Sequence, residues 1–160
     1  MPCLTAAFDP SIGPLLAVLI TPAGAIQKLA VGGPAPTSPG DGGTVITPVL
    51  MLIDTGADAT CISPQLAQQL NLKSLGLRPV GGATGAALRN KYLVDVGIPF
   101  PGGQTTPGTV VSAFTIAVPN IEVIEFVGRS PHFQGLLGRD ILLNAHFSMS
   151  SWARTFTICM

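Results

Sequence analysis

Hydrophobic residues along the chain fall into short runs that glycine- and proline-rich segments separate. Residues 14–20, PLLAVLI, and residues 44–53, TVITPVLMLI, are aliphatic runs bounded by turn-forming residues, a pattern typical of buried strands. In residues 92–96 apolar side chains recur at every second position, which is the period of a strand. Further strands are predicted at residues 109–118, 121–127, 147–150 and 155–158, the last two as a hairpin.

Two short helices are predicted between these strands. Ser63 followed by Pro64 is a good helix start, because serine caps the first turn and proline suits the first helical position. In residues 65–70 the apolar side chains then lie on one face. Residues 141–147, ILLNAHF, fit a second short helix. Many short strands with two short helices predict an all-β domain, either a closed barrel or a sandwich.

Length and composition favour a single domain over residues 1–160. The chain has 19 glycines and 15 prolines, which suit turns better than helices. Residues 32–43, GGPAPTSPGDGG, predict a mobile loop, and residues 25–31 before it could pair with the first strand as a hairpin. A linker between domains is the competing interpretation, but about thirty residues are too few for a stable domain.

Charge is sparse and balanced, with eight basic and eight acidic residues among 160. Proteins that bind nucleic acids or anionic membrane surfaces need clustered Lys and Arg. We therefore expect neither a nucleic acid nor a membrane as a partner. No apolar run approaches the roughly 20 residues of a membrane span. No basic residue precedes the first apolar run, so a signal peptide is not expected either.

The cysteines indicate no metal site. Cys3, Cys61 and Cys159 are odd in number and widely spaced, with no C-x-x-C pair, so a structural zinc site and any other metal site are not expected. We expect reduced thiols in a cytoplasmic protein.

One short motif carries candidate chemistry. Asp54, Thr55 and Gly56 follow directly on an apolar strand, which would partly withdraw the carboxylate from water. Gly56 would let the backbone turn sharply and let a substrate approach, and the Thr55 hydroxyl would brace the loop. An isolated D-T-G also occurs by chance, and a turn aspartate would then be the simpler interpretation.

Three motifs in order make the pattern more specific. The segments are LIDTGADATCISPQLAQQLNL, PVGGATGAALRNKYLVDV and GLLGRDILLNAHF, which lie within residues 50–147. They resemble the active-site segment, the flap hairpin and the second signature of retropepsin-like aspartic proteases. The sequence ISPQLAQQL in the first segment is closer to the cellular and bacterial members of the family than to the viral ones. The resemblance does not extend to residues 1–12, and the loops at 32–43 and 99–108 are longer than in a minimal viral protease.

The resemblance implies an all-β acid-protease barrel with a flap hairpin and one or two short helices. Asp54 is the only D-T-G aspartate in the chain, and the chemistry needs two facing carboxylates that share a proton. It therefore also implies a two-fold symmetric homodimer. One Asp54 would take a proton from water while the other polarises the scissile carbonyl of a peptide or protein substrate. No cofactor is implied, and activity is expected on the acidic side of neutrality.

Roles for individual residues follow from the same resemblance. Asp54, Thr55 and Gly56 form the catalytic motif, while Gly138 and Arg139 support the dimer. Substrate contacts are expected from two further groups, Ala57 with Asp58 in the active-site loop and Gly81, Gly82, Ala83, Thr84 and Gly85 in the flap.

Two nearby charges allow more than one interpretation. Asp58 is expected to pair with Arg139 near the dimer interface, although two solvated surface charges remain the alternative. Asp140 is expected to be a first-turn helix residue that the helix dipole favours, without a catalytic role.

Two other functions stay open. A peptide-binding or dimerisation module could keep this fold and cleave nothing, and a structural β protein could carry D-T-G by chance. A serine-hydrolase triad is not expected, because no G-x-S-x-G is present. His132 and His146 are therefore interpreted as structural.

Overall fold

The computed structural model of the chain describes residues 1–25, 48–82, 85–100, 114–126 and 130–160. Within these ranges the secondary structure is almost entirely β. The elements in chain order are β1 (Cys3–Ala7), β2 (Leu15–Pro22), β3 (Pro48–Ile53), β4 (Cys61–Ile62), α2 (Pro64–Gln69), β5 (Leu77–Gly82), β6 (Gly85–Phe100), β7 (Phe114–Glu125), β8 (Gly135–Leu137), α3 (Arg139–Leu142), β9 (His146–Ser150) and β10 (Thr155–Cys159).

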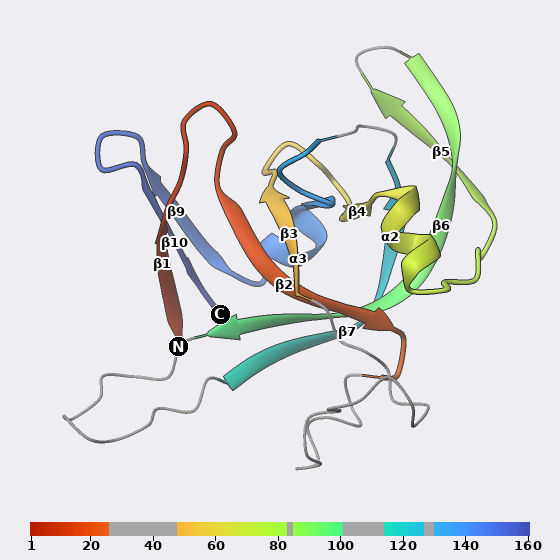
Figure 1. The fold of residues 1–160 in the computed structure, drawn as a ribbon, viewed down its shortest axis with the longest axis horizontal. Coiled ribbons are helices and arrows are strands. Elements are labelled where there is room, and N and C mark those ends of the chain that lie inside the picture. The colour runs from red at the N-terminus through yellow and green to blue at the C-terminus, as the bar shows by residue number, and fades with distance from the viewer. Residues whose placement is uncertain (26–47, 83–84, 101–113, 127–129) are drawn as a thin grey trace.

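Six of the described strands close into a barrel (Figure 1). The order runs β2-β3-β8-β4-β7-β6, and β6 pairs back onto β2. β5 adds to the outer half of β6 as a hairpin that stands away from the barrel body. The all-β prediction is confirmed, and the closed arrangement decides for the barrel over the sandwich.

The barrel interior is filled by apolar side chains that alternate along its strands. Leu16, Val18 and Ile20 of β2 are buried because successive strand residues point to opposite faces. The same period buries every second residue of β3, whereas residues 94–98 of β6 are all buried. The side chains that fill the core without solvent exposure include Val18, Ile20, Met51, Ile62, Val94, Val96, Ile98, Leu137 and Ile141.

The structure corrects the prediction of two strands after residue 108. A single strand, β7, runs from Phe114 to Glu125 and pairs with β6 along its length. The turn expected in its middle is instead a local irregularity, with Asn120 at a positive φ of 56° and a register shift between Val94 and Val96.

Asp95 lies within that register shift and is fully buried. Its carboxylate accepts hydrogen bonds from the backbone N–H of Gly24 at 2.8 Å and of Asn120 at 3.0 Å. Alternation alone would place Asp95 on the polar face. The structure instead buries it as an acceptor for two backbone N–H groups, Gly24 in the turn after β2 and Asn120 at the irregularity in β7.

The first predicted helix is confirmed and the second needs correction. Ser63 caps α2 by accepting a hydrogen bond from the Leu66 N–H. The second helix, α3, begins earlier than residue 141 and ends at Leu142, so that His146 already belongs to β9. No helix in the described ranges is long and apolar enough to cross a membrane.

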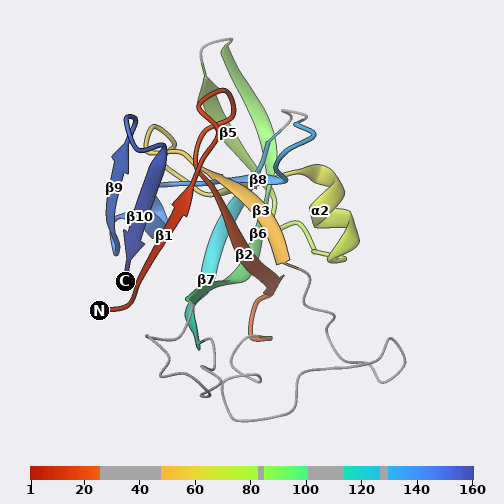
Figure 2. The ribbon, with the colours of Figure 1, turned by 60° about the vertical axis from the view of Figure 1, so that its left-hand side comes forward.

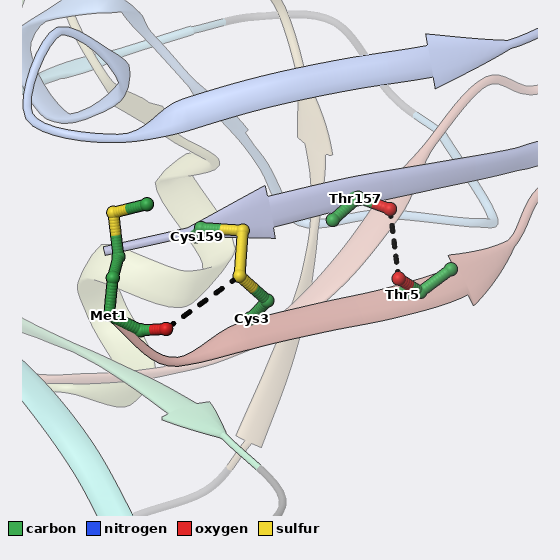
Figure 3. The surroundings of a disulfide bond; sticks show 5 residues. All are labelled: Met1, Cys3, Thr5, Thr157 and Cys159. Carbon is green, nitrogen blue, oxygen red and sulfur yellow. Dashed lines mark hydrogen bonds between the residues drawn. A yellow bond between two sulfur atoms is a disulfide. The ribbon is translucent and has the colours of Figure 1, made fainter.

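A three-stranded sheet in the order β1-β10-β9 stands beside the barrel, on the side away from α2 (Figure 2). β1 pairs antiparallel with β10 from Cys3 opposite Cys159 to Ala7 opposite Thr155. This pairing brings the two ends of the chain together. A disulfide joins Cys3 and Cys159, whose Cα atoms are 4.1 Å apart, and the hydroxyls of Thr5 and Thr157 hydrogen-bond nearby at 2.8 Å (Figure 3).

The expectation of reduced thiols is therefore wrong for two of the three cysteines. Cys3 and Cys159 are 156 positions apart, and only the pairing of β1 with β10 makes them neighbours. Cys61 is the free cysteine.

Several predicted features lie outside the described residues. They are the hairpin partner at 26–31, the loop at 32–43, the start of the strand predicted at 44–53, most of the loop at 99–108, and the flap positions 83–84. The division of the chain into a single domain over 1–160 stays a prediction.

Candidate active site

Asp54 stands where β3 leaves the barrel. Ile53 before it is buried, whereas Asp54 itself is partly exposed. Its backbone N–H donates to the Leu137 carbonyl on β8 at 3.0 Å. Asp54 thus lies at the end of a strand that pairs with β2 on one side and β8 on the other. Such a position holds a carboxylate more precisely than a free loop does.

The residues after Asp54 form a tight turn around its carboxylate. The Gly56 N–H donates to Asp54 Oδ1 at 2.9 Å, and the Ala57 N–H donates to the Asp54 carbonyl at 3.2 Å. A Cβ at Gly56 would lie 3.2 Å from Asp54 Oδ1, so glycine gives the carboxylate room. Thr55 and Gly56 are both exposed.

Two motifs that are about 80 residues apart in sequence interlock behind this turn. The Asp140 carboxylate accepts from the Thr60 N–H at 2.8 Å and from the Thr60 hydroxyl at 2.7 Å. Thr60 Oγ1 in turn accepts from the Gly138 N–H at 3.1 Å. Thr60 is fully buried, so these hydrogen bonds fix the active-site loop against the start of α3.

Gly138 is where the two motifs come closest, and this contact gives a prediction about stability. A Cβ at this position would lie 2.5 Å from the Ala59 carbonyl carbon and 2.8 Å from the Thr60 nitrogen. Backbone atoms cannot rotate away, so we expect Gly138→Ala to lower the free energy of unfolding by about 2 kcal/mol. Urea denaturation measures this. Gly81→Ala is the matched control, since a Cβ at Gly81 would meet no atom within 4 Å and the stability of this variant should not fall. Equal stability of the two variants would contradict the tight contact.

Asp58 and Arg139 form the expected ion pair through Oδ1 and a guanidinium nitrogen. Both side chains are largely exposed, at 80% and 53%, so the pair adds little to stability. It links the active-site loop to α3 at the surface, beside the Arg139 N–H that donates to the Ala57 carbonyl at 2.9 Å.

A cavity of about 490 Å³ opens beside Asp54. The active-site loop lines one side of it and β5 of the β5–β6 hairpin lines another. Its described lining is Asp54, Gly56, Ala57, Asp58, Ala59, Cys61, Arg78, Pro79, Val80, Gly81, Ile124, Phe126 and Leu136. A carboxylate at the edge of a mostly apolar cavity is an arrangement that can bind an extended ligand and act on it.

The structure brings together part of the site that the sequence predicts. Asp54, Gly56, Ala57, Asp58 and Gly81 all line the cavity. Thr55 does not belong to that lining, and Gly82 and Gly85 pair with each other at the end of the hairpin. Ala83 and Thr84 lie outside the described residues.

Sequence reasoning missed the rest of the lining and the support behind it. Arg78, Pro79 and Val80 immediately precede the predicted flap tip and would have been found by extending the flap strand inward. Ile124 of β7 is paired with Cys61 of β4, and the Phe126 N–H donates to the Ile62 carbonyl. No local signal marks these two residues, because this pairing joins distant parts of the sequence. Thr60 was likewise not singled out, because its role depends on contact with Asp140.

Cys61 is half-buried in the cavity wall. Burial, with smaller contributions from the Asp140 and Asp54 carboxylates, raises the pKa of its thiol to about 11. The thiol stays protonated at neutral pH, which is typical of a packing cysteine rather than a nucleophile. Among the described residues no cluster of three His, Cys, Asp or Glu side chains could hold a metal ion.

The family model of aspartyl proteases matches residues 40–141. The chain belongs to the aspartyl protease family. That match contains both the D-T-G loop and the G-R-D segment at the start of α3, the two motifs that the structure interlocks. A comparison of this aspartyl protease family member with curated proteins gave no match.

The fold of this aspartyl protease family member is also that of a solved structure. A retropepsin-like aspartic protease from Rickettsia conorii superposes with a TM-score of 0.55 at 13% sequence identity, over 98% of this chain and 89% of the other. At this identity the likeness concerns the fold. Together with the family match it confirms the predicted retropepsin-like family.

Proposed function

We propose that the chain is an aspartic endopeptidase that acts as a homodimer, with one Asp54 from each subunit in a shared active site. The observation that carries the proposal is the position of Asp54. It lies at the end of a barrel strand, beside a cavity that the flap hairpin also lines. The family membership supports protease chemistry at this position.

The need for a second copy follows from counting carboxylates. Aspartic-protease chemistry needs two carboxyl groups that share a proton. Of the two acidic residues among the described cavity lining, Asp58 is held by Arg139. The second carboxyl group is therefore proposed to come from a partner subunit. The exposed Thr55 and Gly56 leave the active-site loop open to such a partner.

The proposed reaction divides between the two carboxyl groups. The ionised Asp54 accepts a proton from water as the water oxygen attacks the scissile carbonyl carbon, and the protonated Asp54 donates to the carbonyl oxygen. The resulting tetrahedral diol collapses when the C–N bond breaks and a proton passes to the leaving amine. The rate should fall at low pH, where both carboxyls are protonated, and at higher pH, where the shared proton is lost.

Other residues receive supporting roles in this proposal. Gly56 would lie against the substrate backbone, and residues 81–85 would close over it as a lid that excludes water. Thr55 would hydrogen-bond to the partner's matching loop across the two-fold axis. Gly138 and Arg139 would hold the active-site loop of their own subunit in place. Their contacts with Thr60 and Ala57 support this role.

Mixing two kinds of subunit tests the shared site. At a fixed total concentration, an equal mixture of wild-type protein and the Asp54→Asn variant should keep about one quarter of the wild-type activity, because only dimers with two intact subunits work. Cleavage of a quenched-fluorescence peptide, after the subunits have exchanged, measures this. A chain that worked alone would keep half. A mixture with Asp9→Asn, whose carboxylate lies outside the cavity lining, should keep full activity.

A further inference from the structure

Arg78 is the cationic side chain among the described residues that line the Asp54 cavity, whereas Asp54 and Asp58 are acidic. It lies on β5, two positions before Val80, so both side chains belong to one face of the strand. The Arg78 side chain is 49% exposed. Arg78 therefore belongs to the wall of the cavity and keeps about half of its side chain accessible to solvent.

The carboxylate beside Arg78 is shared with another cation. Glu122 on β7 contacts Arg78 at 3.4 Å through Oε1 and Lys91 at 2.9 Å through Oε2. The hydrogen bond from Lys91 is the main reason that the pKa of Glu122 lies below its usual value, and Arg78 contributes less. Two positive charges thus face one negative charge, and the Arg78 contact is the longer one.

The charge of Arg78 also reaches the cavity wall opposite β5. Burial raises the pKa of the Cys61 thiol, and the Arg78 guanidinium acts in the opposite direction. Cys61 lies on β4 and is paired with Ile124 of β7. The positive charge of Arg78 thus acts both on Glu122, which it contacts, and on Cys61, which lines the cavity.

The walls around Arg78 are apolar. Val80, Ile124, Leu136 and Phe126 line the same cavity, and the Phe126 ring is stacked against Phe133 at 6.3 Å between ring centroids. A side chain with an aliphatic stem and a negative end would place its methylene groups on these walls and its carboxylate at Arg78. A guanidinium can bind a carboxylate through two parallel hydrogen bonds.

We infer that Arg78 is a specificity residue that selects peptides with an acidic side chain at the substrate position lying against β5. The inference rests on the proposed function, because the substrate is taken to be a peptide. The acidic groups of the cavity oppose such a ligand only in part, because Arg139 compensates the charge of Asp58 and the proposed pair of Asp54 carboxyls shares a proton.

Peptide pairs that differ only by Glu or Gln, placed in turn at each position around the scissile bond, test the inference. The assay is run near pH 5.5, about one unit above the ordinary pKa of Glu, so that the peptide carboxylate is ionised. At one position the wild type should cleave the Glu peptide with a kcat/KM about tenfold higher than the Gln peptide, the effect of one charged hydrogen bond. High salt should reduce this preference.

Variants of the same ion cluster separate specificity from a structural role. Arg78→Met should abolish the Glu preference, so that the Glu and Gln peptides are cleaved with equal kcat/KM, and Arg78→Glu should favour a Lys peptide instead. Lys91→Met is the matched control, since Lys91 holds the same Glu122 carboxylate but does not belong to the cavity lining. It should keep the Glu preference.

Two results would overturn the inference while the proposed function stands. They are equal cleavage of the Glu and Gln peptides by the wild type at every position, and a preference that survives Arg78→Met. If neither peptide is cleaved, the proposed function fails. The labelled peptide pair is then compared for binding to wild type and Arg78→Met by fluorescence anisotropy, where equal affinities would reject the role of Arg78.

Discussion

Peptide cleavage should fall about ten-thousandfold in Asp54→Asn, the upper end of what general acid–base catalysis contributes. An amide can neither take a proton from water nor give one to the carbonyl oxygen, so both proposed halves of the reaction are lost. The fold should survive, because the Asn side-chain oxygen can still accept the hydrogen bond from the Gly56 N–H. Initial rates on a peptide pool at mildly acidic pH measure the effect.

Asp9→Asn is the matched control for this variant. Asp9 Oδ1 accepts a hydrogen bond from the N–H two residues later, at 2.8 Å from Ser11, as Asp54 Oδ1 does from Gly56 at 2.9 Å. The two substitutions therefore disturb the same kind of turn, and only one of them removes a carboxylate from the cavity. Retained cleavage in Asp54→Asn would reject the proposed mechanism.

The same pair of variants addresses the non-catalytic alternative. A binding module would bind peptides without cleaving them, and Asp54→Asn would leave any such binding largely intact. Measurable turnover by the wild type that Asp54→Asn abolishes and Asp9→Asn preserves would decide for the enzyme.

Reduction of the Cys3–Cys159 disulfide should lower the free energy of unfolding by about 4 kcal/mol, because the bond closes a loop of nearly the whole chain and restricts the unfolded state. Within the described strands β1 pairs only with β10, so its release on reduction should be visible early. Guanidinium denaturation with and without a reductant measures the loss of stability. Hydrogen exchange of residues 3–7 measures the release of β1.

Cys3→Ser supplies the control for reduction. Cys3 is exposed, so serine is tolerated there, and the variant should be as unstable as the reduced wild type and insensitive to reductant. Thiol labelling of the denatured, unreduced wild type should modify one cysteine, Cys61. Labelling of all three would contradict the disulfide.

The disulfide bears on where the protein works. Disulfides persist in oxidising compartments and are rare in the cytosol. The cytoplasmic location expected from the sequence stays a prediction, and the joined chain ends weigh against it.

Local features of this protein could be predicted from its sequence because they depend on near neighbours. A turn-bounded aliphatic run located β2, and period-2 alternation located the middle of β6, since a strand places successive side chains on opposite sides. The Ser63–Pro64 pair located the start of α2, because capping involves atoms three residues apart. The D-T-G motif located the candidate carboxylate at a strand end, because the motif directly follows an apolar strand in the sequence.

Only the tertiary structure decided the features that depend on distant pairing. Cys3 and Cys159 meet because β1 lies against β10. Asp95 is buried where the β6–β7 register shifts, and its carboxylate accepts from the backbone N–H groups of Gly24 and Asn120, which lie far from it in the sequence. Arg78 joins the cavity because β5 lines it together with residues of β4 and β7. A sequence pattern reports how a residue relates to its own strand, whereas these contacts depend on which strands become neighbours and in what register.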